Sequence, residues 1–213
     1  MIYLIHIFRN FRKFIKYPIQ FMKLLSSDIK KDFFFNKNEK KIKSILVIGL
    51  PKSGTTLIEW ILSELGYLNM TSSFLRVFDE RHLVNPHDLS DNMLKNFPKN
   101  RPTYLKTHSS PSEFNLKLIK KYDYKIIISF RNLKDVMISR YLHVLYDKSL
   151  PQHYIYKDLN YIEGFKTSLI KNHLNTIPIQ VMHNWIINWR KEISVNKKFC
   201  ELNYDEYVDN KKN

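Results

Sequence analysis

Short apolar runs alternate with amphipathic stretches over residues 44–203 of this chain. The apolar runs, whose β-branched and aromatic residues are typical of strands, are 44–49, 103–106, 124–130 and 198–203. The amphipathic stretches, whose spacing is that of helices, are 55–65, 112–121, 132–146 and 178–193. Strands that alternate with helices predict a single α/β domain with a mostly parallel sheet flanked by helices.

The N-terminal segment has a different pattern, in which bulky apolar and basic side chains interleave at roughly helical spacing over residues 1–25. Pro18 is expected to kink or interrupt that helix. The apolar runs are too short and too charged for a membrane span, and a signal peptide would have its basic residues first. A helix on an anionic membrane surface and a helix packed on the domain body both remain open. Residues 36–43 form a polar linker, so we divide the chain into 1–43 and a domain at 44–213.

The net charge and the cysteine content limit the kinds of binding partner and compartment that the sequence favours. The formal charge of the 213 residues is +15, and residues 1–43 contribute about +8 of it, with 11 Lys/Arg against 3 Asp/Glu. This balance favours an anionic partner, which is a nucleic acid, an anionic membrane or a phosphorylated ligand. The one cysteine, Cys200, excludes an internal disulfide and is expected to be a small buried residue. It fits a cytoplasmic protein, with membrane association as a further possibility.

A glycine-containing loop at residues 49–56 (Gly-Leu-Pro-Lys-Ser-Gly-Thr-Thr) joins the first predicted strand to the first predicted helix. Backbone N–H groups in such a turn, together with the helix N-terminus, favour a bound anion. Gly54 lets the backbone approach the ligand closely, and Thr55 and Thr56 add hydroxyl donors. The pattern predicts a P-loop-like nucleotide-binding core.

The loop differs from that of nucleotide triphosphatases, which has the form G-x-x-x-x-G-K-[ST]. Gly49 and Gly54 have the required spacing, but Thr55 stands where the lysine should be. The lysine is Lys52, inside the loop. We therefore expect a different, shorter anion than a triphosphate. An ordinary turn with a chance lysine is the alternative, and the strand–loop–helix context disfavours it.

Residues 106–108 (Lys-Thr-His) follow the second predicted strand. Histidine titrates near neutral pH and can take a proton from an acceptor, and a cation offsets charge that develops on a leaving group. Because side chains alternate in extended chain, Lys106 and His108 are expected to point the same way. A histidine is often structural, and this chain has 8 of them.

Arg131 ends the third predicted strand, and Ser139 lies two helical turns further along the chain. The planar guanidinium of arginine binds phosphate oxygens in pairs, so a second phosphate site is one interpretation. The other interpretation is that Arg131 forms a surface ion pair and Ser139 lies on a solvated face.

In their order and approximate spacing these three motifs resemble the cytosolic-type sulfotransferases, and the resemblance covers about residues 44–207. It implies a co-substrate, 3'-phosphoadenosine 5'-phosphosulfate, and His108 as the general base. We expect Lys52 and Lys106 to be catalytic as well, by stabilising the bridging and leaving phosphate oxygens. The resemblance assigns the phosphosulfate to Lys52, Ser53, Gly54, Thr55 and Thr56, the 3'-phosphate to Arg131 and Ser139, and the adenine to Tyr204.

Several positions depart from the family's pattern. Leu57 stands where many members have a tryptophan that stacks on adenine, and Leu133 stands where proline is usual. The acids after Tyr204 are exchanged relative to the family's Tyr-Glu-Asp segment. The chain ends at Asn213, before the family's basic Arg-Lys-Gly loop, so it resembles a short or C-terminally truncated member.

The sequence therefore predicts a sulfotransferase that acts on a hydroxyl or amine of a small-molecule, lipid or glycan acceptor and requires no metal. Specific nucleic-acid binding is not expected, and the sequence makes no prediction of oligomeric state. Two alternatives remain, which are an inactive truncated sulfotransferase-like binding protein and a nucleotide kinase with an atypical loop. Phe74, Phe78 and Tyr146 are candidates for an acceptor pocket but are expected to belong to the core.

Overall fold

The computed structural model describes residues 44–70, 88–95, 97–98, 102–170, 177–196 and 198–209. The predictions for residues 1–43, Phe74 and Phe78 lie outside these residues. In the part that is described, no helix is long and apolar enough to cross a membrane.

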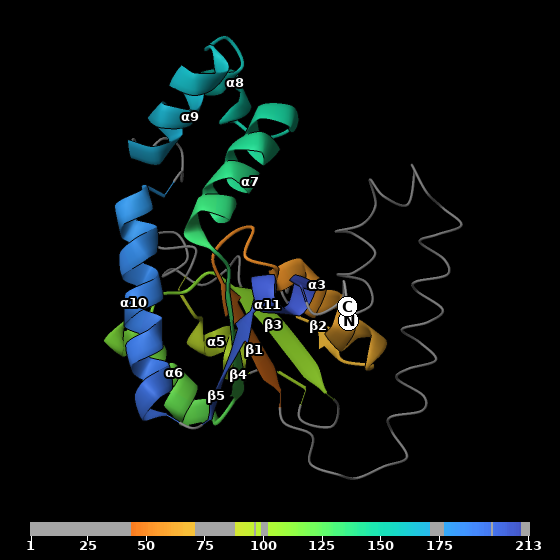
Figure 1. Cartoon of the computed structure of the whole chain (residues 1–213). Helices are drawn as coiled ribbons and strands as arrows, with labels where there is room; N and C mark the ends of the chain where they lie inside the picture. The colour runs from red at the N-terminus through yellow and green to blue at the C-terminus, as the bar shows by residue number, and fades with distance from the viewer. Residues whose placement is uncertain are drawn as a thin grey trace, which may run out of the picture. The chain divides into compact units, whose positions relative to one another are not determined.

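The strands form one five-stranded parallel sheet (Figure 1). In chain order they are β1 (Ile45–Gly49), β2 (Leu68–Asn69), β3 (Thr103–Thr107), β4 (Lys125–Phe130) and β5 (Phe199–Asn203). Their order across the sheet is β2-β3-β1-β4-β5, and Leu68 of β2 is in register with Thr103 of β3. The α/β prediction is confirmed, and each predicted strand lies within one residue of its observed bounds.

The described helices are α3 (Thr55–Glu64), α5 (Asp91–Lys95), α6 (Glu113–Tyr122), α7 (Leu133–Tyr146), α8 (His153–Tyr156), α9 (Tyr161–Ile170), α10 (Ile179–Val195) and α11 (Tyr204–Asp209). The four predicted helices are α3, α6, α7 and α10, and their ends differ from the prediction by at most two residues. Helices α5, α8, α9 and α11 and strand β2 were not predicted. Except for α9 they are too short to show a hydrophobic period.

Two compact units can be distinguished, and strands β1 and β4 contribute residues to both. The first unit contains β2, β3, α5, α6 and α3 from Thr56 onward. The second contains the loop between β1 and α3, the strand β5 and helices α7 to α11.

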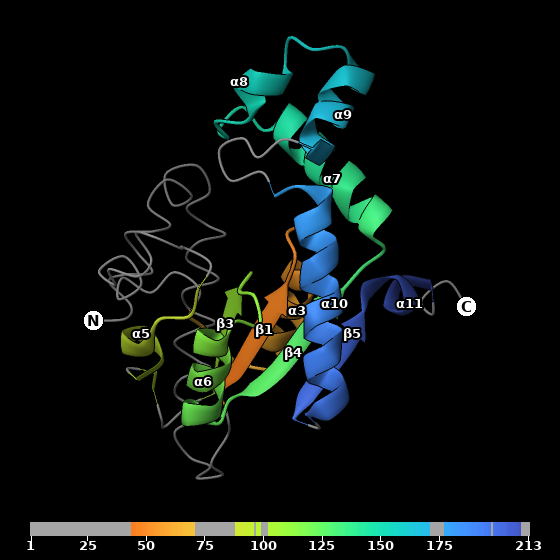
Figure 2. The same cartoon turned by 90° about the vertical axis from the view of Figure 1, so that its left-hand side faces the viewer.

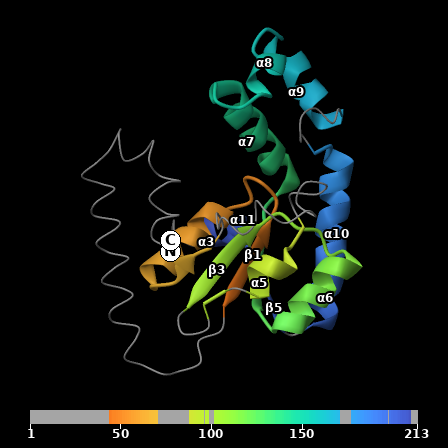
Figure 3. The same cartoon turned by 180° about the vertical axis from the view of Figure 1, so that it is seen from behind.

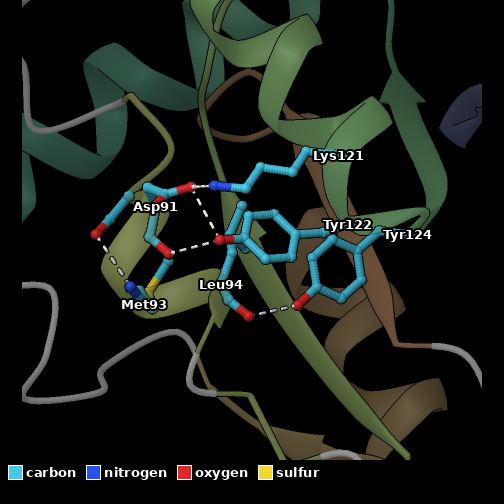
Figure 4. A network of polar contacts seen from close by, with 7 residues as sticks. Asp91, Met93, Leu94, Lys121, Tyr122 and Tyr124 are labelled. Atoms are coloured by element: carbon cyan, nitrogen blue, oxygen red, sulfur yellow. Dashed lines mark hydrogen bonds and ion pairs between the residues drawn. The ribbon is translucent and has the colours of Figure 1, made fainter.

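In the first unit, α5 and α6 lie side by side and are joined by a polar network (Figures 3 and 4). The carboxylate of Asp91 accepts hydrogen bonds from Lys121 Nζ at 2.7 Å and from the Tyr122 hydroxyl at 2.9 Å. The hydrogen bond from Lys121 is the main reason why the pKa of Asp91 lies below its usual value. The buried hydroxyl of Tyr124 donates to the Leu94 carbonyl at 2.9 Å, and burial raises the pKa of Tyr124.

The core of the second unit is aromatic. Helix α10 runs along β4 and β5 (Figure 2), and its tryptophans lie four residues apart, on one face. Trp185 contacts Phe130 of β4 edge-on at 6.0 Å between ring centres, and Trp189 contacts Phe199 of β5 at 6.0 Å. The helical spacing of the two tryptophans thus packs one face of α10 against the sheet. This packing fixes the end of β4, which immediately precedes Arg131.

Helices α7, α8 and α9 extend from the end of β4 (Figure 1). They are tied to the start of α10 by Arg140, which is buried in α7. Its guanidinium donates to the Ile177 carbonyl at 2.5 Å and to the Ser168 carbonyl at 2.9 Å. Burial lowers the pKa of Arg140. These charged hydrogen bonds compensate for taking the guanidinium out of water.

Two burial predictions are wrong. Cys200 is exposed, because β5 is an edge strand of which only Phe199 is buried. Tyr146 was expected in the core, but its side chain is 76% exposed, because it is the last residue of α7.

Candidate functional site

The loop between β1 and α3 has an unusual backbone. Lys52 has a φ of 71° and Gly54 a φ of 92°, so both lie in the left-handed region, with Ser53 between them. Backbone that alternates in hand turns successive N–H groups toward one point, which is the geometry of an anion-binding nest. A lysine in this region costs roughly 1–3 kcal/mol, and such strain is found mainly at functional sites.

The loop leads directly into the first turn of α3. The Ser53 backbone N–H and its hydroxyl both donate to the Leu50 carbonyl, at 3.1 and 2.7 Å. Ser53 and Thr55 are buried, and Thr56 is exposed. The N–H groups of the first turn of a helix have no partner within the helix. Together with the nest they form a site suited to a phosphate.

Strand β4 holds the loop from behind. The hydroxyl of Ser129, which is fully buried, donates to the Ser53 carbonyl at 2.6 Å. Arg131 Nη1 donates to the Lys52 carbonyl at 3.2 Å. Two consecutive loop carbonyls are therefore bound to β4, which fixes the orientation of the loop. Ser129 was not among the residues predicted from the sequence, although it is a polar residue within the apolar run 124–130.

Tyr204, the first residue of α11, contacts both the loop and Arg131. A Cβ atom on Gly54 would be 2.2 Å from Cδ2 of the Tyr204 ring. The Arg131 guanidinium lies over the same ring, 5.0 Å from its centre. Because Nη1 of the same guanidinium donates to the Lys52 carbonyl, Arg131 is held by both the ring and the loop.

Asp205, whose role was not predicted from the sequence, forms an ion pair with Arg131. One carboxylate oxygen lies 3.7 Å from Arg131 Nε, and the other accepts the backbone N–H of Asn132 at 2.6 Å. Arg131 Nε itself is buried without a hydrogen-bond partner among the described residues. Ser139 lies half-buried in the second turn of α7.

The Lys-Thr-His segment is at the end of β3, in the first unit. Lys106 and His108 are half-buried, and Thr107 between them is buried, which agrees with the expected alternation. The Thr107 hydroxyl accepts the Ser109 backbone N–H at 3.2 Å. The buried Asn115 side chain donates to the Ser110 carbonyl at 2.9 Å. These two hydrogen bonds fix the backbone conformation just after His108. Lys106 forms an ion pair with Glu59 of α3.

The structure thus brings five of the predicted residues into one cluster within the second unit, namely Lys52, Ser53, Gly54, Arg131 and Tyr204. Lys106 and His108 lie in the first unit. Within the described ranges, no group of three or more His, Cys, Asp or Glu side chains is placed to hold a metal ion. The cluster combines a loop with the backbone geometry of an anion-binding nest, two cationic side chains and an aromatic ring, which are the groups expected of a nucleotide site.

A comparison with protein-family models decides the family. Residues 43–213 match the model described as "Sulfotransferase domain". The chain belongs to this sulfotransferase family. The family resemblance noted in the sequence is therefore confirmed over most of the chain. No curated protein sequence gave a match to this sulfotransferase domain.

Solved structures support the fold of this sulfotransferase domain. Mouse sulfotransferase SULT7A1, whose crystal structure is a complex with PAP, is similar with a TM-score of 0.54 and 16% sequence identity. The match covers 84% of this chain and 57% of the mouse chain, so the sulfotransferase domain described here spans little more than half the length of that relative. At this identity the similarity establishes the shared α/β fold.

Proposed function

We propose that this protein transfers a sulfuryl group from 3'-phosphoadenosine 5'-phosphosulfate to an acceptor hydroxyl or amine. The observation that carries the proposal is the contact of the loop at Lys52–Gly54 with both Arg131 and Tyr204. These residues come from three segments far apart in the chain, and each segment resembles a motif of the family's nucleotide site. An ordinary turn would need neither the left-handed Lys52 nor a second cation at the loop.

The roles follow from the chemistry of each group. The loop N–H groups and Lys52, with Ser53, Thr55 and Thr56, would bind the 5'-phosphosulfate. Arg131, helped by Ser139, would bind the 3'-phosphate through its guanidinium. Tyr204 would also contact the adenine. Since the chain supplies cations and N–H groups for every phosphate, the mechanism requires no metal.

The proposed transfer is an in-line displacement. The acceptor oxygen attacks sulfur and forms the new S–O bond, while the bond from sulfur to the bridging oxygen of the 5'-phosphate breaks. His108 takes the acceptor's proton, and the electron pair of the broken bond stays on the departing phosphate. Lys52 and Lys106 offset the charge that develops there. The products are a sulfated acceptor and 3'-phosphoadenosine 5'-phosphate.

Calorimetric titration tests the nucleotide class. We expect 3'-phosphoadenosine 5'-phosphate to bind in the presence of a chelator, and to bind much better than ATP with Mg²⁺. Because a charged hydrogen bond contributes roughly 1.5–3 kcal/mol, Arg131→Ala should weaken this binding by roughly one to two decades. The loss should be smaller for adenosine 5'-phosphate, which lacks the 3'-phosphate.

The other outcomes identify the alternatives. Tight metal-dependent ATP binding that is indifferent to a 3'-phosphate would assign the protein to the nucleotide kinases. Nucleotide binding without transfer, in a screen of phenols, alcohols, amines, lipids and sugars with labelled donor, would indicate an inactive binding protein. The same screen would identify the acceptor if transfer occurs.

A further inference from the structure

Glu59 of α3 forms an ion pair with Lys106 of β3 inside the first unit. The Glu59 side chain is 12% exposed and that of Lys106 24%, so the pair is largely shielded from water. Exposed ion pairs contribute little to stability because water and salt screen them, whereas an ion pair that is shielded from water keeps its geometry. The pair is therefore a defined feature of the site's scaffold.

The second oxygen of Glu59 is also bound. Glu59 Oε1 accepts a hydrogen bond from Asn69 Nδ2 of β2 at 3.3 Å, while Oε2 contacts Lys106. A carboxylate held at both oxygens has a fixed orientation. A lysine side chain has a flexible four-carbon stem, and a fixed partner restricts where its ammonium group lies.

A carboxylate is an unexpected neighbour for a lysine that serves an anionic co-substrate, because its charge opposes the binding of another anion. Affinity for the nucleotide therefore does not explain why Glu59 is paired with Lys106. Orientation of the ammonium group does explain it, because a cation that is already in position stabilises developing charge without reorganisation in the transition state.

We propose that Glu59 is the positioning residue of Lys106, which it holds ready for the charge that appears on the departing phosphate oxygen. This inference rests on the proposed sulfuryl transfer. Glu59 does not touch the reacting atoms and acts only through the lysine. It predicts a loss in turnover without a loss in nucleotide affinity.

Steady-state kinetics on Glu59→Gln, Lys106→Met and the double variant test the proposal, with titration of 3'-phosphoadenosine 5'-phosphate for each. Gln keeps the size of Glu59 and an oxygen for Asn69 but lacks the charge. We expect kcat to fall about tenfold, which corresponds to about 1.4 kcal/mol, while Kd stays unchanged or becomes tighter. The double variant should be no slower than Lys106→Met, because both substitutions remove the same interaction.

Two further variants serve as controls. Glu64→Gln removes a carboxylate that is exposed on the same helix and should leave kcat unchanged. Glu59→Asp keeps the charge with a shorter reach and should give an intermediate kcat, which provides a second reading if Glu59→Gln folds poorly.

The outcomes separate the inference from the function on which it rests. An unchanged kcat in Glu59→Gln, additive losses in the double variant, or a weaker Kd together with a lower Tm would overturn the positioning role alone. A wild-type protein that transfers no sulfuryl group would overturn the proposed function and the inference with it.

Discussion

The ring of Tyr204 lies directly against the α-carbon of Gly54, where a Cβ atom would come within 2.2 Å of the ring. The same glycine has a φ of 92°. Position 54 is therefore closed to other residues by its backbone conformation and by its neighbour, independently of any ligand.

The first prediction concerns this contact. Gly54→Ala should lower the free energy of unfolding by roughly 1–3 kcal/mol, because alanine is strained at this φ and displaces the Tyr204 ring. Binding of 3'-phosphoadenosine 5'-phosphate should be lost. Denaturant titration and calorimetry measure both effects. Adding Tyr204→Ala relieves the clash but not the strained φ, so stability should recover only in part. A Gly54→Ala protein as stable as wild type would contradict the packing described here.

The second prediction concerns Ser129. Ser129→Ala removes the donor to the Ser53 carbonyl and leaves a buried carbonyl without that hydrogen bond, which costs roughly 1–3 kcal/mol. The loop should then bind nucleotide more weakly, and calorimetry together with denaturant titration would show both changes. Ser194→Ala is a matched control, because this exposed serine donates to the Lys191 carbonyl within its own helix α10. Equal effects of the two substitutions would show that Ser129 does not support the loop.

The third prediction concerns the proposed base. His108→Ala should abolish transfer to a defined acceptor and leave the Kd of 3'-phosphoadenosine 5'-phosphate nearly unchanged, because a general base acts on the acceptor's proton. Turnover assays with labelled donor, and titration of the same preparations, measure the two. His143→Ala, at an exposed position in α7, should behave as wild type. Wild-type turnover in His108→Ala would make His108 structural.

The fourth prediction concerns pH. The pKa of Asp91 is lowered mainly by the hydrogen bond from Lys121, so the folded state binds the proton of Asp91 less tightly than the unfolded state does. The stabilisation is present above the unfolded pKa of about 4 and is lost as pH falls through the folded pKa. The Tm of Asp91→Asn should therefore lie below that of wild type at pH 7, and the difference should shrink toward pH 3. A pH-independent difference would contradict this linkage.

The fifth prediction concerns residues 1–25. Deleting them should reduce co-sedimentation with vesicles that contain anionic lipid, because Phe and Ile side chains interleave there with Arg and Lys. Nucleotide binding should be unaffected. Equal sedimentation with and without the segment would favour a helix that packs on the domain.

Most of the fold could be predicted from the sequence, because β1, β4 and α10 carry their periodicity in continuous stretches. The loop could also be found, since glycine is rare in this chain and Lys52 has an unusual place between two glycines. Ser129 and Glu59 were missed for a common reason. Each is a single polar residue whose importance depends on a partner from another part of the chain, Ser53 for Ser129 and Lys106 for Glu59. A local sequence pattern does not reveal such a pair.

Burial was less predictable than secondary structure. Cys200 is apolar enough for a core position, but β5 is an edge strand and the side chain faces solvent. Tyr146 fits a helical pattern, yet it is the last residue of α7 and lies beyond the residues that pack on that helix. The roles of all the predicted site residues in binding and transfer stay predictions, because they depend on a bound nucleotide and acceptor.

The dependence of the loop on Ser129, Arg131 and Tyr204 has a consequence for the order of folding. Its carbonyls are held by residues 76 and 79 positions later in the chain, and Gly54 is packed by a residue later still. On a ribosome, β1 and α3 emerge long before the parts that shape the turn between them. We therefore expect a nascent chain stalled before Tyr204 to form local helix and strand but not a nucleotide site, so that ligand capture reports completed synthesis of this region.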